Sequence, residues 1–148
     1  MNILVSACLL GKACRYDGKS KPCEVVQNLA ERHTLIPVCP EVLGGLPTPR
    51  PPCEIVDGRV LDCDGNDRTE EYQKGAQEAL RIAQENGCTV AVLKENSPSC
   101  GCGKIHNGKF DGGLAEGNGI TAELLLKNGI AVHGESKANI AGALGTFA

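Results

Sequence analysis

Three cysteines occupy equivalent positions in this chain, at or just beyond the ends of three apolar segments. Cys8 and Cys39 each end such a segment, and Cys100 follows a third one, Val90–Leu93, after a Ser-Pro-Ser sequence. Each segment is typical of a buried strand, and the carboxyl ends of parallel strands form one sheet edge, where ligands bind. We therefore expect three thiols to meet in one crevice. Three thiolates on one face indicate an iron–sulfur cluster or a metal, which would be reactive if one coordination position stayed open.

Polar side chains accompany two of these cysteines. Glu41 lies two residues after Cys39, and Ser97 lies three residues before Cys100. Beside a metal site, a carboxylate is a candidate general base for water, and a hydroxyl can relay a proton or bind substrate. We take Glu41 and Ser97 as candidate catalytic residues. The loop after the first apolar segment adds a cation, an aromatic ring and a carboxylate as candidate substrate-binding residues: Arg15, Tyr16 and Asp17.

The chain contains nine cysteines, which is an unusual number for its length. An odd count with no secretion signal argues against a disulfide scaffold and for a reducing cytoplasm. Buried cysteines usually behave as small hydrophobic residues, and Cys23 and Cys88 fit that description. Cys63 fits a turn. The remaining three lie on loops at the site side of the sheet, as spectators or auxiliary thiols: Cys14, Cys53 and Cys102.

Zinc is the main metal alternative to iron and sulfur. Structural zinc sites usually take their ligands in close pairs such as Cys-x-x-Cys, and this chain has none. Its only close pair is Cys100-Gly101-Cys102, and its three histidines are scattered. A zinc-stabilised structural domain is therefore the weaker hypothesis. The segment Asp62–Asp67 resembles a calcium loop but lacks the glycine and glutamate spacing of an EF-hand, so we expect a polar turn there.

Composition limits the class of protein and of partner. A chain of 148 residues fits one domain spanning residues 1–148. With two Phe, two Tyr and no Trp, its core must be aliphatic, which suits a parallel sheet covered by helices. The net charge is −3 without a basic stripe, so we expect a small substrate rather than a long nucleic acid. No segment approaches the ~20 apolar residues of a membrane span.

Strand and helix patterns alternate along the chain. We expect strands at 3–8, 34–39, 89–94 and 130–133, and helices starting at Pro22, over 69–86, over 119–128 and over 138–144. The first helix would have Ser20 as a cap and an apolar stripe made of Val25, Val26, Leu29 and Ala30. This order predicts a single α/β domain, Rossmann-like, with a mostly parallel sheet of about four strands flanked by helices.

Three connecting segments have distinct compositions. Residues 40–52 contain five prolines and predict a rigid, non-helical loop that forms a wall of the site. Residues 55–61 predict a small β-hairpin insertion on a type I′ turn at Asp57-Gly58. Residues 95–118 are rich in glycine and polar residues and predict a long loop.

Several of these segments together resemble the thiouracil desulfidase family, and they cover nearly the whole chain. The matching stretches are Val5–Gly11, Arg15–Gly18, Pro37–Pro47, Pro49–Pro52, Ser97–Gly101 and Gly119–Leu125. The resemblance implies a [4Fe-4S] cluster held by Cys8, Cys39 and Cys100. It also implies a fourth iron without a protein ligand, which takes the sulfur of a thiolated base. Glu41 and Ser97 are the catalytic residues that the family pattern implies.

Two functional hypotheses remain beside the zinc domain. In the leading one, the open iron acts as a Lewis acid on a C=S sulfur and Glu41 activates water, so that a thiouracil or thio-nucleotide loses sulfide without redox chemistry. In the alternative, the protein is a [4Fe-4S] sulfur carrier or sensor without turnover. Activity of a cluster-loaded Glu41→Gln variant distinguishes them.

Overall fold

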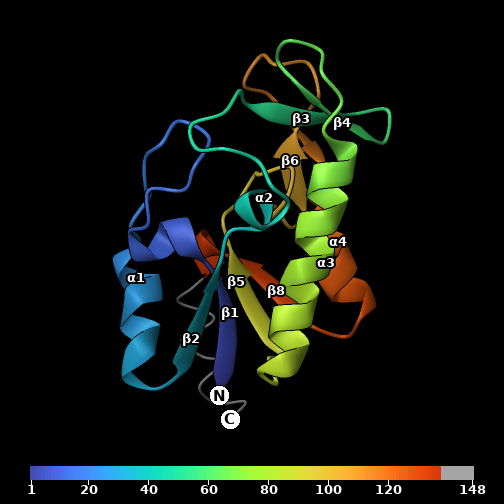
Figure 1. Ribbon diagram of the computed structural model, residues 1–148. Helices are drawn as coiled ribbons and strands as arrows, with labels where there is room; N and C mark the ends of the chain where they lie inside the picture. The colour runs from blue at the N-terminus through green and yellow to red at the C-terminus, as the bar shows by residue number, and fades with distance from the viewer. Residues whose placement is uncertain (138–148) are drawn as a thin grey trace.

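Four short apolar strands form the parallel sheet at the centre of the molecule (Figure 1). The structure is a computed structural model, and it describes residues 1–137. The strands are β1 (Asn2–Ser6), β2 (Thr34–Val38), β5 (Val90–Leu93) and β8 (Ala131–Gly134), in the order β2-β1-β5-β8. Leu4 pairs with Ile36 on one side and with Ala91 on the other. The predicted four-stranded parallel sheet is confirmed.

Alternation along β1 divides the core between the two faces of the sheet. Ile3 and Val5 pack with Val26 and Leu29, whereas Leu4 packs with the cluster that contains Leu125. Successive side chains of a strand point to opposite faces, so an uninterrupted apolar run fills both cores. Helix α1 (Glu24–Gln27) and the 3-10 turn η2 (Asn28–Glu31) cover one face, and α3 (Thr69–Glu85) and α4 (Ile120–Lys127) cover the other (Figure 1).

Helix α3 follows its amphipathic pattern closely. Its buried face includes Tyr72, Ala76, Ala79 and Ala83. The helix ends one residue earlier than expected, just before Gly87, whose φ of +65° fits a left-handed helix terminus. Helix α4 likewise lies inside its predicted range.

The predicted hairpin insertion is confirmed as β3 (Cys53–Val56) and β4 (Arg59–Asp62). Its turn residues Asp57 and Gly58 have φ values of +49° and +78°, as a type I′ turn requires. After β4, the carboxylate of Asp62 accepts backbone N–H bonds from Asp64 and Asn66. This geometry is the polar turn that the sequence predicted there.

Three expectations about local structure were wrong. The first helix begins at Glu24 after Cys23 without a Ser20 cap, and Val25 and Ala30 of its predicted stripe are exposed. The proline-rich segment contains α2 (Pro40–Leu43), because a proline at the first helical position costs no hydrogen bond. Residues 95–118 contain the antiparallel pair β6 (Lys104–His106) and β7 (Leu114–Glu116), although their composition predicted a loop.

The remaining elements are two 3-10 turns, η1 (Ala7–Leu10) directly after β1 and η3 (Glu135–Lys137) directly after β8. The helix predicted at 138–144 lies outside the described residues. None of the helices within residues 1–137 combines the length and apolar character that a membrane crossing needs.

Candidate active site

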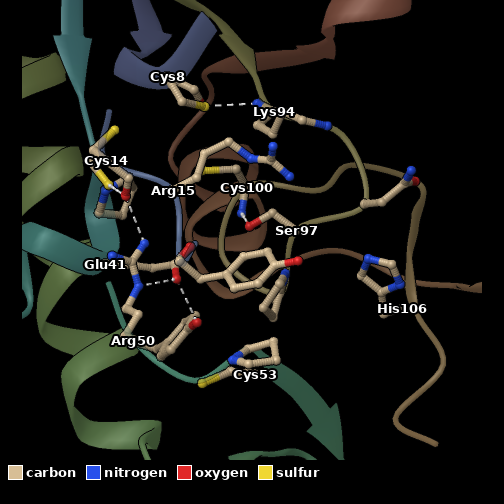
Figure 2. Close-up of a pocket in the computed structure, with 18 of the residues that line it drawn as sticks. Cys8, Cys14, Arg15, Glu41, Arg50, Cys53, Lys94, Ser97, Cys100 and His106 are labelled. Atoms are coloured by element: carbon tan, nitrogen blue, oxygen red, sulfur yellow. Dashed lines mark hydrogen bonds and ion pairs between the residues drawn. The ribbon is translucent and has the colours of Figure 1, made fainter. Parts of the chain in front are cut away.

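A cavity of about 420 Å³ lies at the carboxyl edge of the parallel sheet. Its lining includes Cys8 just after β1, Cys39 just after β2, and Cys100 in the loop after β5. Figure 2 shows Cys8 and Cys100 at this cavity. In the strand order β2-β1-β5-β8, the chain places β2 on one side of β1 and then β5 and β8 on the other side. The topological switch point therefore lies between β1 and β5. Such a switch point opens a crevice at the carboxyl ends of the strands, and this explains why the cavity is there. The three cysteines share one cavity, as their placement predicted.

Two of the three thiols are buried, and Cys39 is partly buried. Cys8 and Cys100 are 7% and 6% exposed. Burial raises the pKa of Cys100 to about 12. Hydrogen bonding to the Cys14 side chain and then burial raise the pKa of Cys39 far above its usual range. Because thiolates are the species that bind metals, loading this site must release protons.

The spacing of these donors bears on which metal group fits. Within residues 1–137, no three His, Cys, Asp or Glu side chains come close enough to hold a single metal ion. The zinc hypothesis therefore gains no support from the geometry. A polynuclear iron–sulfur cluster binds one thiolate at each of several irons, so its ligands are more widely separated. Three separate thiols around one cavity fit such a cluster.

Glu41 stands in the first turn of α2 with its carboxylate at the cavity. Its Oε2 accepts one hydrogen bond from the Tyr72 hydroxyl at 2.8 Å and another from Arg50 Nε at 3.1 Å (Figure 2). Both bonds end on Oε2, so neither of them uses Oε1. The carboxylate is thereby fixed in orientation without using its second oxygen.

Arg50 is itself held tightly. Its side chain is 3% exposed, and it also donates to the Pro47 carbonyl, the Thr48 hydroxyl and the Cys14 carbonyl. Burial is the largest single influence on the pKa of Arg50 and lowers it, but the charge and the hydrogen bond of Glu41, together with smaller contributions from Cys39 and Tyr72, raise the pKa overall. Arg50 therefore stays a cation, and its guanidinium ties the proline-rich segment to the loop that contains Cys14.

Tyr72 reaches the site from helix α3. Burial, followed by the charge of Glu41, raises the pKa of Tyr72 far above its usual range, so the hydroxyl remains a donor. Sequence reasoning missed both Arg50 and Tyr72. Tyr72 lies on the apolar stripe of α3 and was interpreted as core, and it is indeed 1% exposed. An arginine flanked by prolines was the only available signal for Arg50.

Ser97 lines the cavity and shapes the turn that positions Cys100. Its Oγ accepts hydrogen bonds from the backbone N–H groups of Ser99 and Cys100, each at 3.1 Å. Behind this turn, the Ser99 and Thr121 hydroxyls form a buried 2.8 Å hydrogen bond that ties it to α4. Ser97 thus has a structural role in addition to its predicted catalytic one.

The predicted substrate-binding residues divide into two groups. Arg15 and Tyr16 line the cavity, and the Arg15 guanidinium lies 5.8 Å from the centre of the Tyr16 ring. Asp17 is exposed and is absent from the cavity lining, and its carboxylate accepts the Lys19 N–H at 3.0 Å. Asp17 also forms a 3.9 Å ion pair with Arg15. The loop therefore presents the cation and the ring, and Asp17 supports the turn.

The other cysteines also separate by position. Cys14, Cys53 and Cys63 line the cavity. Cys102 does not, and its Sγ lies 3.7 Å from the Val132 carbonyl oxygen, to which it donates. All nine cysteines are free thiols. Of the three expected on site-side loops, Cys14 and Cys53 are at the site, and Cys102 packs against β8.

The Rossmann-like sheet, with three cysteines and a restrained carboxylate at its switch point, is the architecture of a cysteine-rich α/β enzyme. Residues 3–137 match the 2-thiouracil desulfurase family, and the chain belongs to that family. It is 42% identical over 147 residues to the uncharacterized protein YbbK of Bacillus subtilis (strain 168), covering 93% of this chain and 97% of that protein. The fold matches a solved structure of the [4Fe-4S]-dependent thiouracil desulfidase TudS with a TM-score of 0.86 and 43% identity, covering 97% and 98% of the two chains.

Proposed function

We propose that this protein is a [4Fe-4S]-dependent desulfidase, which replaces the C=S group of a thiolated pyrimidine by C=O and releases sulfide. The observation that supports this most directly is the meeting of three strand-end thiols and an oriented carboxylate in one cavity. The family assignment and the similarity to TudS support the same reaction. We further propose that the whole chain forms one desulfidase domain.

Cys8, Cys39 and Cys100 would hold the cluster, each as a thiolate on one iron. The bound cluster would supply a Lewis-acidic iron without a protein ligand, which can accept the sulfur of the substrate. Such a site needs no electron transfer. The overall reaction consumes one water, forms a C=O bond, breaks the C=S bond and releases hydrogen sulfide.

Glu41 would take a proton from the attacking water. Arg50 and Tyr72 hold its Oε2, so Oε1 is the oxygen available as base. A fixed base near the reacting carbon accelerates proton transfer because no reorientation is needed during the reaction. We propose Ser97 as the group that relays a proton to the departing sulfur or binds the substrate, since it lines the same cavity.

The cavity also indicates the size of the substrate. A volume of about 420 Å³ lies in the range of small-molecule sites. Together with the net charge of −3, this supports a free thiolated base or a thio-nucleotide rather than a long nucleic acid. Nine free thiols fit a reducing environment, so we place the protein in the cytoplasm.

The decisive experiment measures sulfide and uracil formed from 2- and 4-thiouracil and a thio-nucleotide by anaerobically reconstituted protein. Glu41→Gln should keep its iron and lose about 10²- to 10⁴-fold in kcat, the range for a general base. Glu85→Gln, at an exposed end of α3, is the matched control and should retain activity.

Three outcomes would point elsewhere. Full activity of the iron-loaded Glu41→Gln variant would remove the proposed base. A loaded wild-type protein that binds sulfur but never turns over would support the carrier or sensor alternative. A colourless protein that contains zinc after anaerobic purification would support the zinc domain.

A further inference from the structure

Aromatic residues are rare in this chain and are concentrated at the cavity. The sequence has two Phe and two Tyr, and three of these four lie within the described residues: Tyr16, Tyr72 and Phe110. All three line the cavity. Tyr72 is buried against Glu41, whereas Tyr16 and Phe110 are 41% and 39% exposed. An exposed aromatic ring at a cavity is an apolar surface available to a ligand.

Phe110 is held in an unfavourable backbone conformation. Its φ is +54°, in the left-handed region that bulky residues rarely adopt. Strained conformations persist only where the surrounding structure enforces them, and they occur preferentially at functional sites. The strain therefore indicates that the ring has a use at the cavity.

The loop 107–113 between β6 and β7 is fastened to β3. The buried Glu54 carboxylate accepts N–H bonds from Gly108 at 2.9 Å and from Phe110 at 3.3 Å, both on Oε1. Gly108 has a φ of +86°, and a Cβ there would lie 2.5 Å from the Ile55 carbonyl oxygen. The loop thus sits directly against β3, at the end of the molecule away from the parallel sheet (Figure 1).

We propose that Phe110 is a specificity-determining residue, whose ring stacks on the flat face of the substrate heterocycle. This inference rests on the proposed desulfidase function and adds the shape of the substrate. The sheet edge contributes the thiols and Glu41, and the fixed Phe110 loop contributes an apolar wall. Stacking of a base on an aromatic side chain depends on a planar ring, so an acyclic thioamide gains nothing from it. The site therefore selects planar thiolated heterocycles.

The test compares Phe110→Leu, which keeps an apolar side chain but removes the aromatic face, with Phe110→Tyr, which keeps it. Leu114→Ala is the matched control, because Leu114 is an exposed apolar residue of the same hairpin that does not line the cavity. Binding of uracil to the cluster-loaded proteins is measured by calorimetry. KM values for 2-thiouracil and for thioacetamide are measured alongside.

Phe110→Leu should weaken uracil binding and raise the KM for 2-thiouracil about ten-fold. Phe110→Tyr and Leu114→Ala should stay near wild type, and thioacetamide kinetics should not change. Unchanged uracil binding by Phe110→Leu, an equal loss for thioacetamide, or no binding of uracil by wild type would overturn the inference. Uracil binding that depends on Phe110 in a protein that releases no sulfide would refute the desulfidase function and leave the stacking site standing.

Discussion

Glu41 faces the cavity with one of its two carboxylate oxygens already bound. Oε2 takes both the Tyr72 and the Arg50 hydrogen bonds. The two donors come from different elements, α3 and the proline-rich segment, so they fix the carboxylate from two directions. Such an oriented carboxylate can act as a base only through its other oxygen. We propose that Oε1 contacts the attacking water.

Tyr72→Phe should lower kcat about ten-fold with little change in KM. The change removes one hydrogen bond to a charged group, which contributes about 1.5–3 kcal/mol, and leaves the ring in the core. Steady-state kinetics with 2-thiouracil on iron-loaded protein measure the split between kcat and KM. Tyr16→Phe is the control for loss of a hydroxyl at the cavity. A kcat equal to wild type would show that the Tyr72 bond does not orient the base.

The ligand cysteines should differ sharply from the others in iron content. Cys8→Ala, Cys39→Ala and Cys100→Ala should each lose the brown absorbance and the activity, since two thiolates hold a cluster poorly. Cys88→Ala should keep its iron, with a loss of stability of about 1–3 kcal/mol at most. Iron analysis and visible spectra of anaerobic samples provide the measurement.

Cys102→Ala tests whether the fourth iron is free of protein ligands. Because its sulfur packs against the Val132 carbonyl and not in the cavity, this variant should keep the four-iron spectrum and full activity. Electron paramagnetic resonance that detected a three-iron cluster in Cys102→Ala would mean four protein ligands and would favour the carrier.

At the scale of elements, α2 and α3 meet backbone to backbone. A Cβ on Gly75 would lie 1.8 Å from the Pro40 carbonyl oxygen, and one on Gly44 would lie 1.9 Å from the Glu71 carbonyl oxygen. Glycine is unfavourable inside a helix, yet here it lets α2 approach closely enough for Glu41 to reach Tyr72. This crossing fixes the distance between the base and the residue that orients it.

Gly75→Ala should therefore destabilise the protein by about 3 kcal/mol, although alanine favours a helix. It should also lower activity by displacing α2. Urea unfolding monitored by circular dichroism gives the change in stability. Gln73→Ala, at an exposed position of the same helix, is the control and should be neutral or slightly stabilising. Stability of Gly75→Ala at or above that control would show that α2 can move without cost.

The junction between β4 and α3 contributes stability that depends on pH. Asp67 Oδ1 accepts the Thr69 N–H at 2.9 Å, and Oδ2 pairs with Arg59 at 2.9 Å. Hydrogen bonds from the Thr69 side chain and backbone, followed by Arg59, lower the pKa of Asp67 to about 2. The unfolded pKa is about 3.9, so this stabilisation is complete above that pH and is lost as the pH falls towards 2.

Asp67→Asn should accordingly unfold at a lower temperature than wild type at pH 6, and the difference should shrink between pH 4 and pH 2. Thermal unfolding at a series of pH values measures this difference. Asp64→Asn, in the exposed turn nearby, serves as control. If the difference in unfolding temperature between Asp67→Asn and wild type stayed constant across the whole pH range, the charge of Asp67 would contribute nothing to stability.

The sequence predicted the elements that are stabilised by local patterns better than those that depend on tertiary contacts. Strands β1, β2, β5 and β8 and helix α3 follow from local apolar patterns, which is why their ends were predicted to within two residues. Helix α2 and the β6–β7 pair depend on tertiary contacts, namely the Gly75 crossing and the Glu54 bonds to the Phe110 loop. No local pattern encodes either contact. Arg50 and Tyr72 were missed for the same reason.

At the scale of the whole molecule, the three proposed ligands would connect the ends of β1, β2 and β5. A ligand that binds only the folded state stabilises it by mass action. Removing the cluster with an oxidant and chelator should therefore lower Tm by about 5–15 °C. Amide exchange should increase around Cys8, Cys39 and Cys100 but not in the second half of α3. Cys100→Ala given the same treatment should show no change in Tm. A decrease in Tm of equal size in that variant would refute the proposal that the cluster stabilises the fold.

The positions of the three proposed ligands have a consequence for how the protein matures. Cys8, Cys39 and Cys100 follow three different strands, and they come together only after β5 has inserted beside β1. A ribosome-bound chain that has not yet emerged past Cys100 has no complete binding set to offer. If these cysteines hold the cluster, the complete binding site would therefore exist only in the folded chain. Iron and sulfur would then be delivered to a folded protein through its cavity, and not to a short peptide motif.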